Sequence, residues 1–149
     1  MTGNSMDSPL NINLLIPFKD NRGDRKKLYR ADIERFRSKL ENRAAELRSD
    51  IEQLFGPKFE LTISGRSDGS TKKFFWRFRS TTRDRKYVRL NAETVIEYLK
   101  TLDPNQVITL KSVEEELIYI NANLRLVKGM NDAILQSETD ISGLLKLAL

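Results

Sequence analysis

Residues 72–89 constrain the fold more than any other part of the chain, because they combine a strand pattern with concentrated charge. The stretch reads Lys-Lys-Phe-Phe-Trp-Arg-Phe-Arg-Ser-Thr-Thr-Arg-Asp-Arg-Lys-Tyr-Val-Arg and holds eight of the 26 Lys and Arg residues of the protein. In an extended chain, side chains alternate between two faces. One face of the first half then carries Phe74, Trp76 and Phe78, and the opposite face carries Lys73, Phe75, Arg77 and Arg79.

The second half of this stretch repeats the alternation after a polar break. Residues 80–84 suit a turn, and Lys86, Val88 and Leu90 then alternate with Tyr87 and Arg89. With a preceding strand built on Phe59, Leu61 and Ile63, and with residues 65–71 as a turn, the sequence predicts three strands in meander order.

The basic face of this sheet has three possible uses. Its Arg and Lys side chains could be solvated or covered by an acidic helix of the same chain, as on many half-buried sheets. They could instead contact nucleic-acid phosphates while an aromatic ring stacks on a base. They could also meet an acidic protein partner. For the second use, the predicted nucleic-acid-binding residues are Lys73, Phe75, Arg77, Arg79, Arg85, Tyr87 and Arg89, helped by Arg25, Lys26 and Lys27.

Helical periodicity dominates the rest of the chain. From Arg25 to about Phe55, apolar residues recur every three or four positions, which predicts one long amphipathic helix ended by Gly56 and Pro57. A short helix is predicted from Asn91 to about Leu102. A long third helix, beginning between Pro104 and Ser112, follows with the same spacing.

Composition excludes several classes of function. The chain has no cysteine and no histidine, so it lacks thiol nucleophiles, the usual general base near neutral pH and most transition-metal ligand sets. The four tyrosines fall in periodic patterns typical of packing residues. We therefore expect no enzymatic activity, no cofactor and no metal site.

Charge is unevenly distributed along the chain. Residues 1–100 carry 22 Lys and Arg against 14 Asp and Glu, whereas residues 101–149 carry four against seven. This asymmetry favours a polyanion-binding face, or pairing of the acidic part with the basic part. The sequence has no apolar run of membrane-spanning length and no leader pattern, which predicts a cytoplasmic protein without a membrane partner.

Two further patterns complete a resemblance. The run Leu14-Leu15-Ile16-Pro17-Phe18-Lys19 precedes the long helix, and the aromatic-arginine strand Phe75-Trp76-Arg77-Phe78-Arg79 follows it, before a final helix rich in Asn and Leu. Over about residues 12–136 the chain resembles a family of small uncharacterised proteins from integrating conjugative elements. The resemblance implies a bacterial mobile element, where short basic proteins handle DNA or block host defences, and it assigns no functional residues.

These observations predict an α+β fold, in which a three-stranded antiparallel β-meander packs against two long antiparallel helices and one short helix. Residues 1–11 are predicted to be a disordered tail and residues 12–149 a single domain. The predicted function is a non-enzymatic nucleic-acid-binding accessory protein of a mobile genetic element, with DNA ahead of RNA as the partner. The alternatives are a protein-binding regulator or inhibitor that uses the basic face, and a homodimer built on the long helices.

Overall fold

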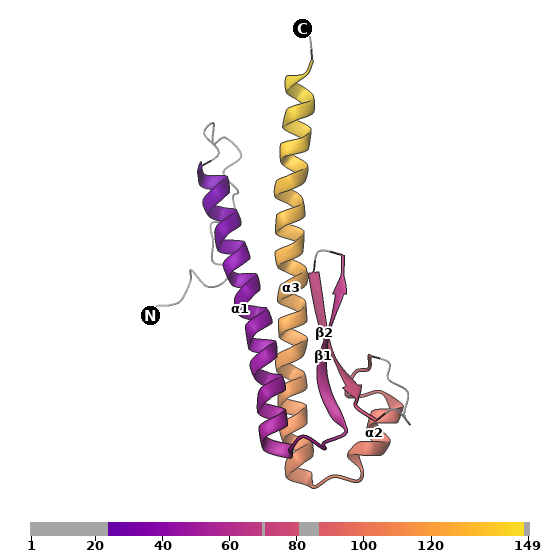
Figure 1. Cartoon of the computed structure of the whole chain (residues 1–149). Coiled ribbons are helices and arrows are strands. Elements are labelled where there is room, and N and C mark those ends of the chain that lie inside the picture. The colour runs from indigo at the N-terminus through magenta and orange to yellow at the C-terminus, as the bar shows by residue number, and fades with distance from the viewer. Residues whose placement is uncertain (1–23, 70, 81–86, 148–149) are drawn as a thin grey trace. The chain divides into compact units, whose positions relative to one another are not determined.

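The computed structural model is α+β, with a two-stranded antiparallel sheet and three helices (Figure 1). It describes residues 24–69, 71–80 and 87–147. The elements are α1 (Asp24–Phe55), β1 (Leu61–Asp68), β2 (Thr71–Phe78), α2 (Glu93–Leu99) and α3 (Pro104–Leu145). The predicted disordered tail, residues 1–11, lies outside the described residues.

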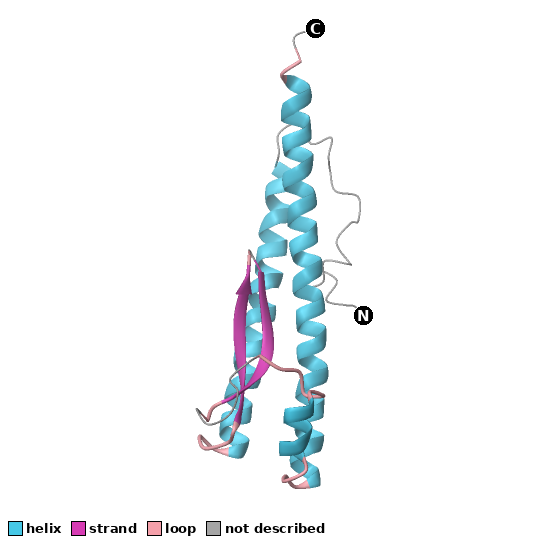
Figure 2. Ribbon diagram, turned by 90° about the vertical axis from the view of Figure 1, so that its right-hand side faces the viewer, coloured by secondary structure: helices cyan, strands magenta, loops and turns pink. Residues whose placement is uncertain are grey.

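The chain divides into two compact units, and the two long helices contribute to both. One unit comprises Met1–Lys39 with Arg125–Leu149, and the other comprises Leu40–Leu124. The second unit contains both strands and α2. Figure 2 shows the hairpin in magenta. We call it the sheet unit and the first the helical unit. A single domain over residues 12–149 stays a prediction.

The helix predicted over residues 25–55 is present as α1, because its apolar stripe matches the helical period along its length. The helix ends at Gly56, whose φ of +86° is the left-handed conformation that glycine adopts without steric cost. The Gly56 amide donates to the Glu52 carbonyl at 3.0 Å and closes the last turn. The Gly-Pro stop read from the sequence is therefore correct.

The core of the sheet unit lies between one face of the hairpin and the helices. Trp76 is fully buried, and its neighbours Leu61, Ile63 and Phe78 are at most 2% exposed. Apolar side chains from α1, α2 and α3 pack against this face: Ala44, Leu47, Ile51, Val95, Leu110, Val113, Leu117, Ile120 and Leu124. The core face of the strands is the one that the alternation of aromatic residues predicted.

The hairpin is longer than predicted. β1 pairs with β2 from Leu61 opposite Phe78 to Asp68 opposite Thr71, so the turn is much shorter than the predicted turn over residues 65–71. Gly69, with φ of +66°, lies in this turn. Gly65 is a strand residue, and a Cβ there would lie 3.1 Å from the ring of its cross-strand partner Phe74. Its glycine therefore makes room for a ring and does not break the strand.

The predicted three-stranded meander is wrong, because the described part of the segment after β2, from residue 87 on, pairs with it at one residue only. Val88 and Trp76 exchange both backbone hydrogen bonds, at 3.0 and 2.9 Å. In this register the next pair would be Phe74 with Leu90. Both backbone groups of Phe74 are instead bonded to the Asn121 side chain of α3, each at 2.9 Å. The Leu90 amide donates to the Glu114 carboxylate at 2.7 Å. Side chains of α3 thus replace a third strand.

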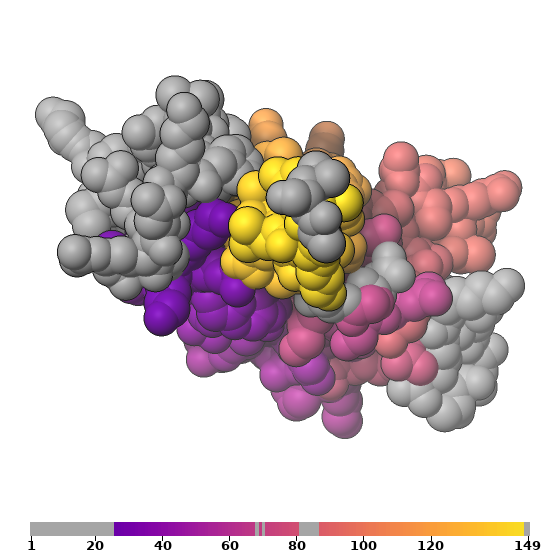
Figure 3. All heavy atoms as spheres, turned by 90° about the horizontal axis from the view of Figure 1, so that it is seen from above, coloured from indigo at the N-terminus to yellow at the C-terminus, as the bar shows by residue number. Residues whose placement is uncertain are grey.

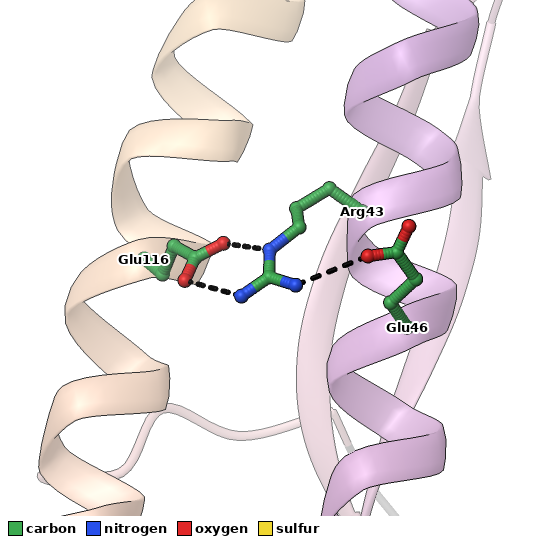
Figure 4. A network of polar contacts seen from close by, with 3 residues as sticks. All are labelled: Arg43, Glu46 and Glu116. Atoms are coloured by element: carbon green, nitrogen blue, oxygen red, sulfur yellow. Dashed lines mark hydrogen bonds and ion pairs between the residues drawn. The ribbon is translucent and has the colours of Figure 1, made fainter.

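Within the sheet unit, α1 and α3 are also joined by an ion pair (Figure 4). Arg43 donates from Nε to one oxygen of Glu116 and from Nη2 to the other at 2.9 Å. It also donates to Glu46, one turn along α1, at 3.1 Å. The hydrogen bonds and the charge of Arg43 hold the pKa of the Glu116 carboxyl below its ordinary value. The pKa of Arg43 rises in turn.

In the helical unit, the first turns of α1 pack against residues 127–138 of α3, whereas residues 139–147 are exposed. Figure 3 shows the start of α1 (indigo) beside the C-terminal part of α3 (yellow). Tyr29 and Ile33 of α1 are buried there, as are Val127 and Ile134 of α3. Arg30 and Glu138 form an ion pair at 2.7 Å between the two helices. Among the described residues, neither long helix combines the length and the apolarity that a membrane crossing requires.

Candidate nucleic-acid interface

The outer face of the hairpin collects the polar and basic side chains of both strands. The register places Thr62 opposite Arg77, Ser64 opposite Phe75, and Arg66 opposite Lys73. Because side chains alternate, these residues project away from the core face that carries Trp76. The sheet therefore has a buried apolar side and an outer side with several cations.

Three guanidinium groups on this face lie over two aromatic rings. The rings of Phe75 and Tyr87 are 6.0 Å apart between centroids and tilted by 59°. The guanidinium carbons of Arg77 and Arg66 lie 5.5 and 6.0 Å from the centroid of Tyr87, and that of Arg89 lies 5.8 Å from the centroid of Phe75. We call these five residues the basic-aromatic cluster. Each cation–π contact of this kind contributes about 0.5–1 kcal/mol at an exposed site and restricts the arginine.

The geometry of the cluster favours phosphate contact over base stacking. Phe75 and Tyr87 are both half-buried, and each ring already has a guanidinium within 6.0 Å of its centroid. A nucleic-acid base would have to compete with these cations for the faces of the rings. Arg66 is exposed, and a planar fork of guanidinium donors suits a phosphate.

Arg79, a predicted site residue, is held by the protein itself. Its Nη2 donates to Glu52 of α1 at 2.9 Å, and its Nη1 donates to the Pro57 carbonyl at 3.2 Å. Glu52 neutralises much of its charge. Arg79 therefore ties the end of β2 to α1, and only part of its guanidinium faces solvent.

Arg89 is also paired, with a carboxylate that is largely buried. Its Nη2 lies 3.3 Å from Oε1 of Glu114, whose side chain is 12% exposed. The other oxygen of Glu114 accepts the Leu90 amide, so the carboxylate serves both residues. Arg77 differs, because in the part of the chain that the structure describes no carboxylate forms an ion pair with it. Arg77 is thus the predicted arginine with the least neutralised charge.

The remaining predicted residues fall into three groups. Lys73 is half-buried on the outer face beside the cluster. Lys26 and Lys27 belong to α1 in the helical unit, and the backbone of Arg25 is in the same helix, so these three are not part of the hairpin face. Arg85 lies outside the described residues.

Sequence reasoning missed Arg66, because Gly65 was taken as the start of a turn. The alternation of Thr62 and Ser64 with buried residues continues through Arg66, and extending it three residues further would have placed this arginine on the outer face. Arg48 was missed for another reason. It belongs to α1, and only tertiary packing brings a helix residue to the edge of the hairpin.

Among the described residues, no group of three or more Asp or Glu side chains is arranged to hold a metal ion. No family model matches the chain, and neither a curated protein nor a solved structure matches it. The likeness to proteins of integrating conjugative elements therefore stays a prediction.

Proposed function

We propose that the outer face of the hairpin binds the phosphate backbone of nucleic acid, and that the protein is a non-enzymatic accessory protein. The observation that supports this most is the basic-aromatic cluster, in which two half-buried rings hold three arginines in place. A cation that is already oriented loses less conformational entropy when it binds a phosphate. The proposed setting is a bacterial mobile element, which rests on the sequence resemblance alone.

The proposed binding has little base specificity. The cluster lies on a sheet face and presents no recognition helix, and its contacts to phosphates carry no sequence information. With two phosphate contacts, from Arg66 and Arg77, the logarithm of the binding constant should fall with the logarithm of salt concentration. The expected slope is about −1.8 for duplex DNA and about −1.4 for a single strand.

The test is fluorescence anisotropy with labelled single-stranded and double-stranded DNA and RNA at low salt. The double variant Arg66→Glu/Arg77→Glu should weaken binding at least roughly tenfold per residue, because each substitution replaces a charge-assisted contact by repulsion. Arg35→Glu is the matched control, since Arg35 is an exposed helix residue of the other unit, paired with Asp32. Equal losses in both variants, or no binding by the unmodified protein, would refute the proposal.

A protein partner is the second candidate, and one feature favours it. A groove of about 410 Å³ lies between the segment around Leu90, α2 and α3. Ile96 and Ile118 line the groove and are 41% and 47% exposed. Lys111 and Glu115 also line it and supply charged groups. An apolar groove with a charged rim is typical of protein-binding surfaces. A nucleic-acid ligand would leave these side chains unaffected, so substitutions at Ile96 and Ile118 separate the two functions.

A further inference from the structure

A second feature of the outer face is a pocket beside the basic-aromatic cluster. It has a volume of about 290 Å³ and lies within the sheet unit, between α1 and the two strands. Its polar lining comes from five residues: Arg48 of α1, Thr62 and Ser64 of β1, Arg77 of β2, and Arg79 just after β2. Thr62 and Arg77 are direct cross-strand partners, so sheet pairing fixes their relative positions.

The pocket has an excess of positive charge. Arg48 and Arg79 share one carboxylate, that of Glu52, at 3.5 and 2.9 Å. Arg77 has no such partner among the residues described. Arg48, Arg77 and Arg79 contribute three positive charges, and Glu52 cancels one of them. Glu60, which immediately precedes β1 and whose carbonyl accepts the Arg79 amide, cancels a second, so one positive charge remains. A small anion would therefore be attracted to the pocket.

Hydrogen-bond donors around the pocket lack acceptors. In the described part of the chain, Nε of Arg77, Nε of Arg79 and the hydroxyl of Thr62 are buried and have no hydrogen-bond partner. Buried donors without acceptors are uncommon in folded proteins, and an ionised acceptor satisfies them best. Three such donors on residues that line one pocket, together with the excess positive charge, favour an oxyanion as its ligand.

The size of the pocket limits what the anion is. Pockets for drug-sized ligands begin at roughly 300 Å³. At about 290 Å³ this one has room for a tetrahedral oxyanion with several waters. Arg77 belongs both to the pocket and to the basic-aromatic cluster, so an anion here continues the cationic surface of the outer face.

We propose that this pocket, with Thr62, Arg48, Arg77 and Arg79 as its polar groups, is a site for one phosphate group. The inference rests on the proposed function for the origin of that phosphate, which would belong to a nucleic-acid strand crossing the outer face. Phosphate binding by the pocket itself rests only on the charge, the donors and the volume described above.

The test is a titration of the full chain with inorganic phosphate, followed by NMR of backbone amides and arginine Nε–H groups. Sodium chloride at equal ionic strength is the reference. The result expected is saturable shifts at the Nε–H of Arg77 and Arg79 and at the amides around Thr62. Thr62→Val, which keeps the shape of the side chain and removes the hydroxyl, should weaken phosphate binding roughly tenfold, and Thr62→Ser should restore it.

Two outcomes would overturn the inference. One is a response to phosphate no larger than that to chloride, and the other is equal affinity in the Thr62→Val and unmodified proteins. A second arm of the experiment adds oligonucleotides, with and without a 5′-phosphate, to compete with inorganic phosphate for the pocket. If oligonucleotides bind while inorganic phosphate does not, the pocket is refuted and the proposed function stands. If inorganic phosphate binds and no oligonucleotide competes, the pocket is supported, the ligand is a free phosphate compound and the proposed function fails.

Discussion

Replacing Asn121 tests how α3 completes the sheet. Its carboxamide accepts the Phe74 amide and donates to the Phe74 carbonyl, each at 2.9 Å, and the residue is 6% exposed. Asn121→Ala leaves both backbone groups buried without partners, at about 1–3 kcal/mol each. Alanine regains at most about 0.7 kcal/mol of helix propensity. The free energy of unfolding of the sheet unit should therefore fall by about 1–6 kcal/mol.

The measurement is urea denaturation followed by fluorescence of Trp76, the single tryptophan, which lies in the core of the same unit. Asn123→Ala is the matched control, because the Asn123 side chain bonds only the Tyr119 carbonyl of its own helix at 2.9 Å. That variant should change the free energy of unfolding by no more than about 0.5 kcal/mol. If the two variants differ by less than this, Asn121 does not hold the edge of β2.

Asn121→Asp tests the same contact by making the free energy of unfolding depend on pH. At neutral pH its carboxylate keeps the acceptor for the Phe74 amide but places a second oxygen against the Phe74 carbonyl. This disfavours the charged form, so the pKa of the new carboxyl rises in the folded state. Stability relative to the unmodified protein should be highest below the unfolded pKa, about 3.9, and should decline as pH rises through the folded pKa. A variant whose relative stability is independent of pH would contradict this geometry.

Three further predictions concern the core, a helix end and the ion pair of the sheet unit. Trp76→Ala should lower the free energy of unfolding by about 3–5 kcal/mol, measured by circular dichroism in urea, because Trp76 is 0% exposed; a loss below 1 kcal/mol would contradict its place in the core. Gly56→Ala should lower the free energy of unfolding by about 1–2 kcal/mol, because the φ of Gly56 is +86°. Gly129→Ala, inside α3 with open space around the added Cβ, should instead raise it by up to about 1 kcal/mol. If both substitutions changed the free energy of unfolding in the same direction, this contrast would be refuted. Because Arg43 lowers the pKa of Glu116, the pair stabilises the fold above the unfolded carboxyl pKa of about 4.3 and loses this effect as pH falls through the folded pKa. Glu116→Gln should cost under about 1 kcal/mol at pH 7, and its difference from the unmodified protein should diminish as pH falls through the folded pKa; a difference that does not diminish in acid would contradict the assignment.

The sequence identified the long first helix because its period is local and repeated over many turns. The bounds of α1, Asp24–Phe55, agree closely with the stripe and with the Gly-Pro stop. The prediction of a third strand is wrong because Asn121 and Glu114 take its place. Both are side chains of a helix that follows later in the chain. A local alternation pattern carries no information about such competitors for a strand edge.

The candidate site was predictable in part, because side-chain alternation along a strand is also a local pattern. Alternation placed Phe75 and Arg77 on one face, and the pairing of Val88 with Trp76 brings Tyr87 and Arg89 beside them. Periodicity could not show that Arg79 and Arg89 have carboxylate partners on helices, nor that Arg48 joins the pocket. Those facts depend on packing between segments distant in sequence.

The central claim is that oriented arginines on the outer face bind phosphates, and the salt dependence of nucleic-acid affinity tests it most directly. The binding constant for a labelled DNA strand is measured by anisotropy across a series of salt concentrations, for the unmodified protein and for Arg66→Gln/Arg77→Gln. Removing two phosphate contacts should make the log–log slope shallower by about 1.4 for a single strand and about 1.8 for a duplex. An unchanged slope in the double variant would contradict the claim, because the arginines of the cluster would then not contact phosphates.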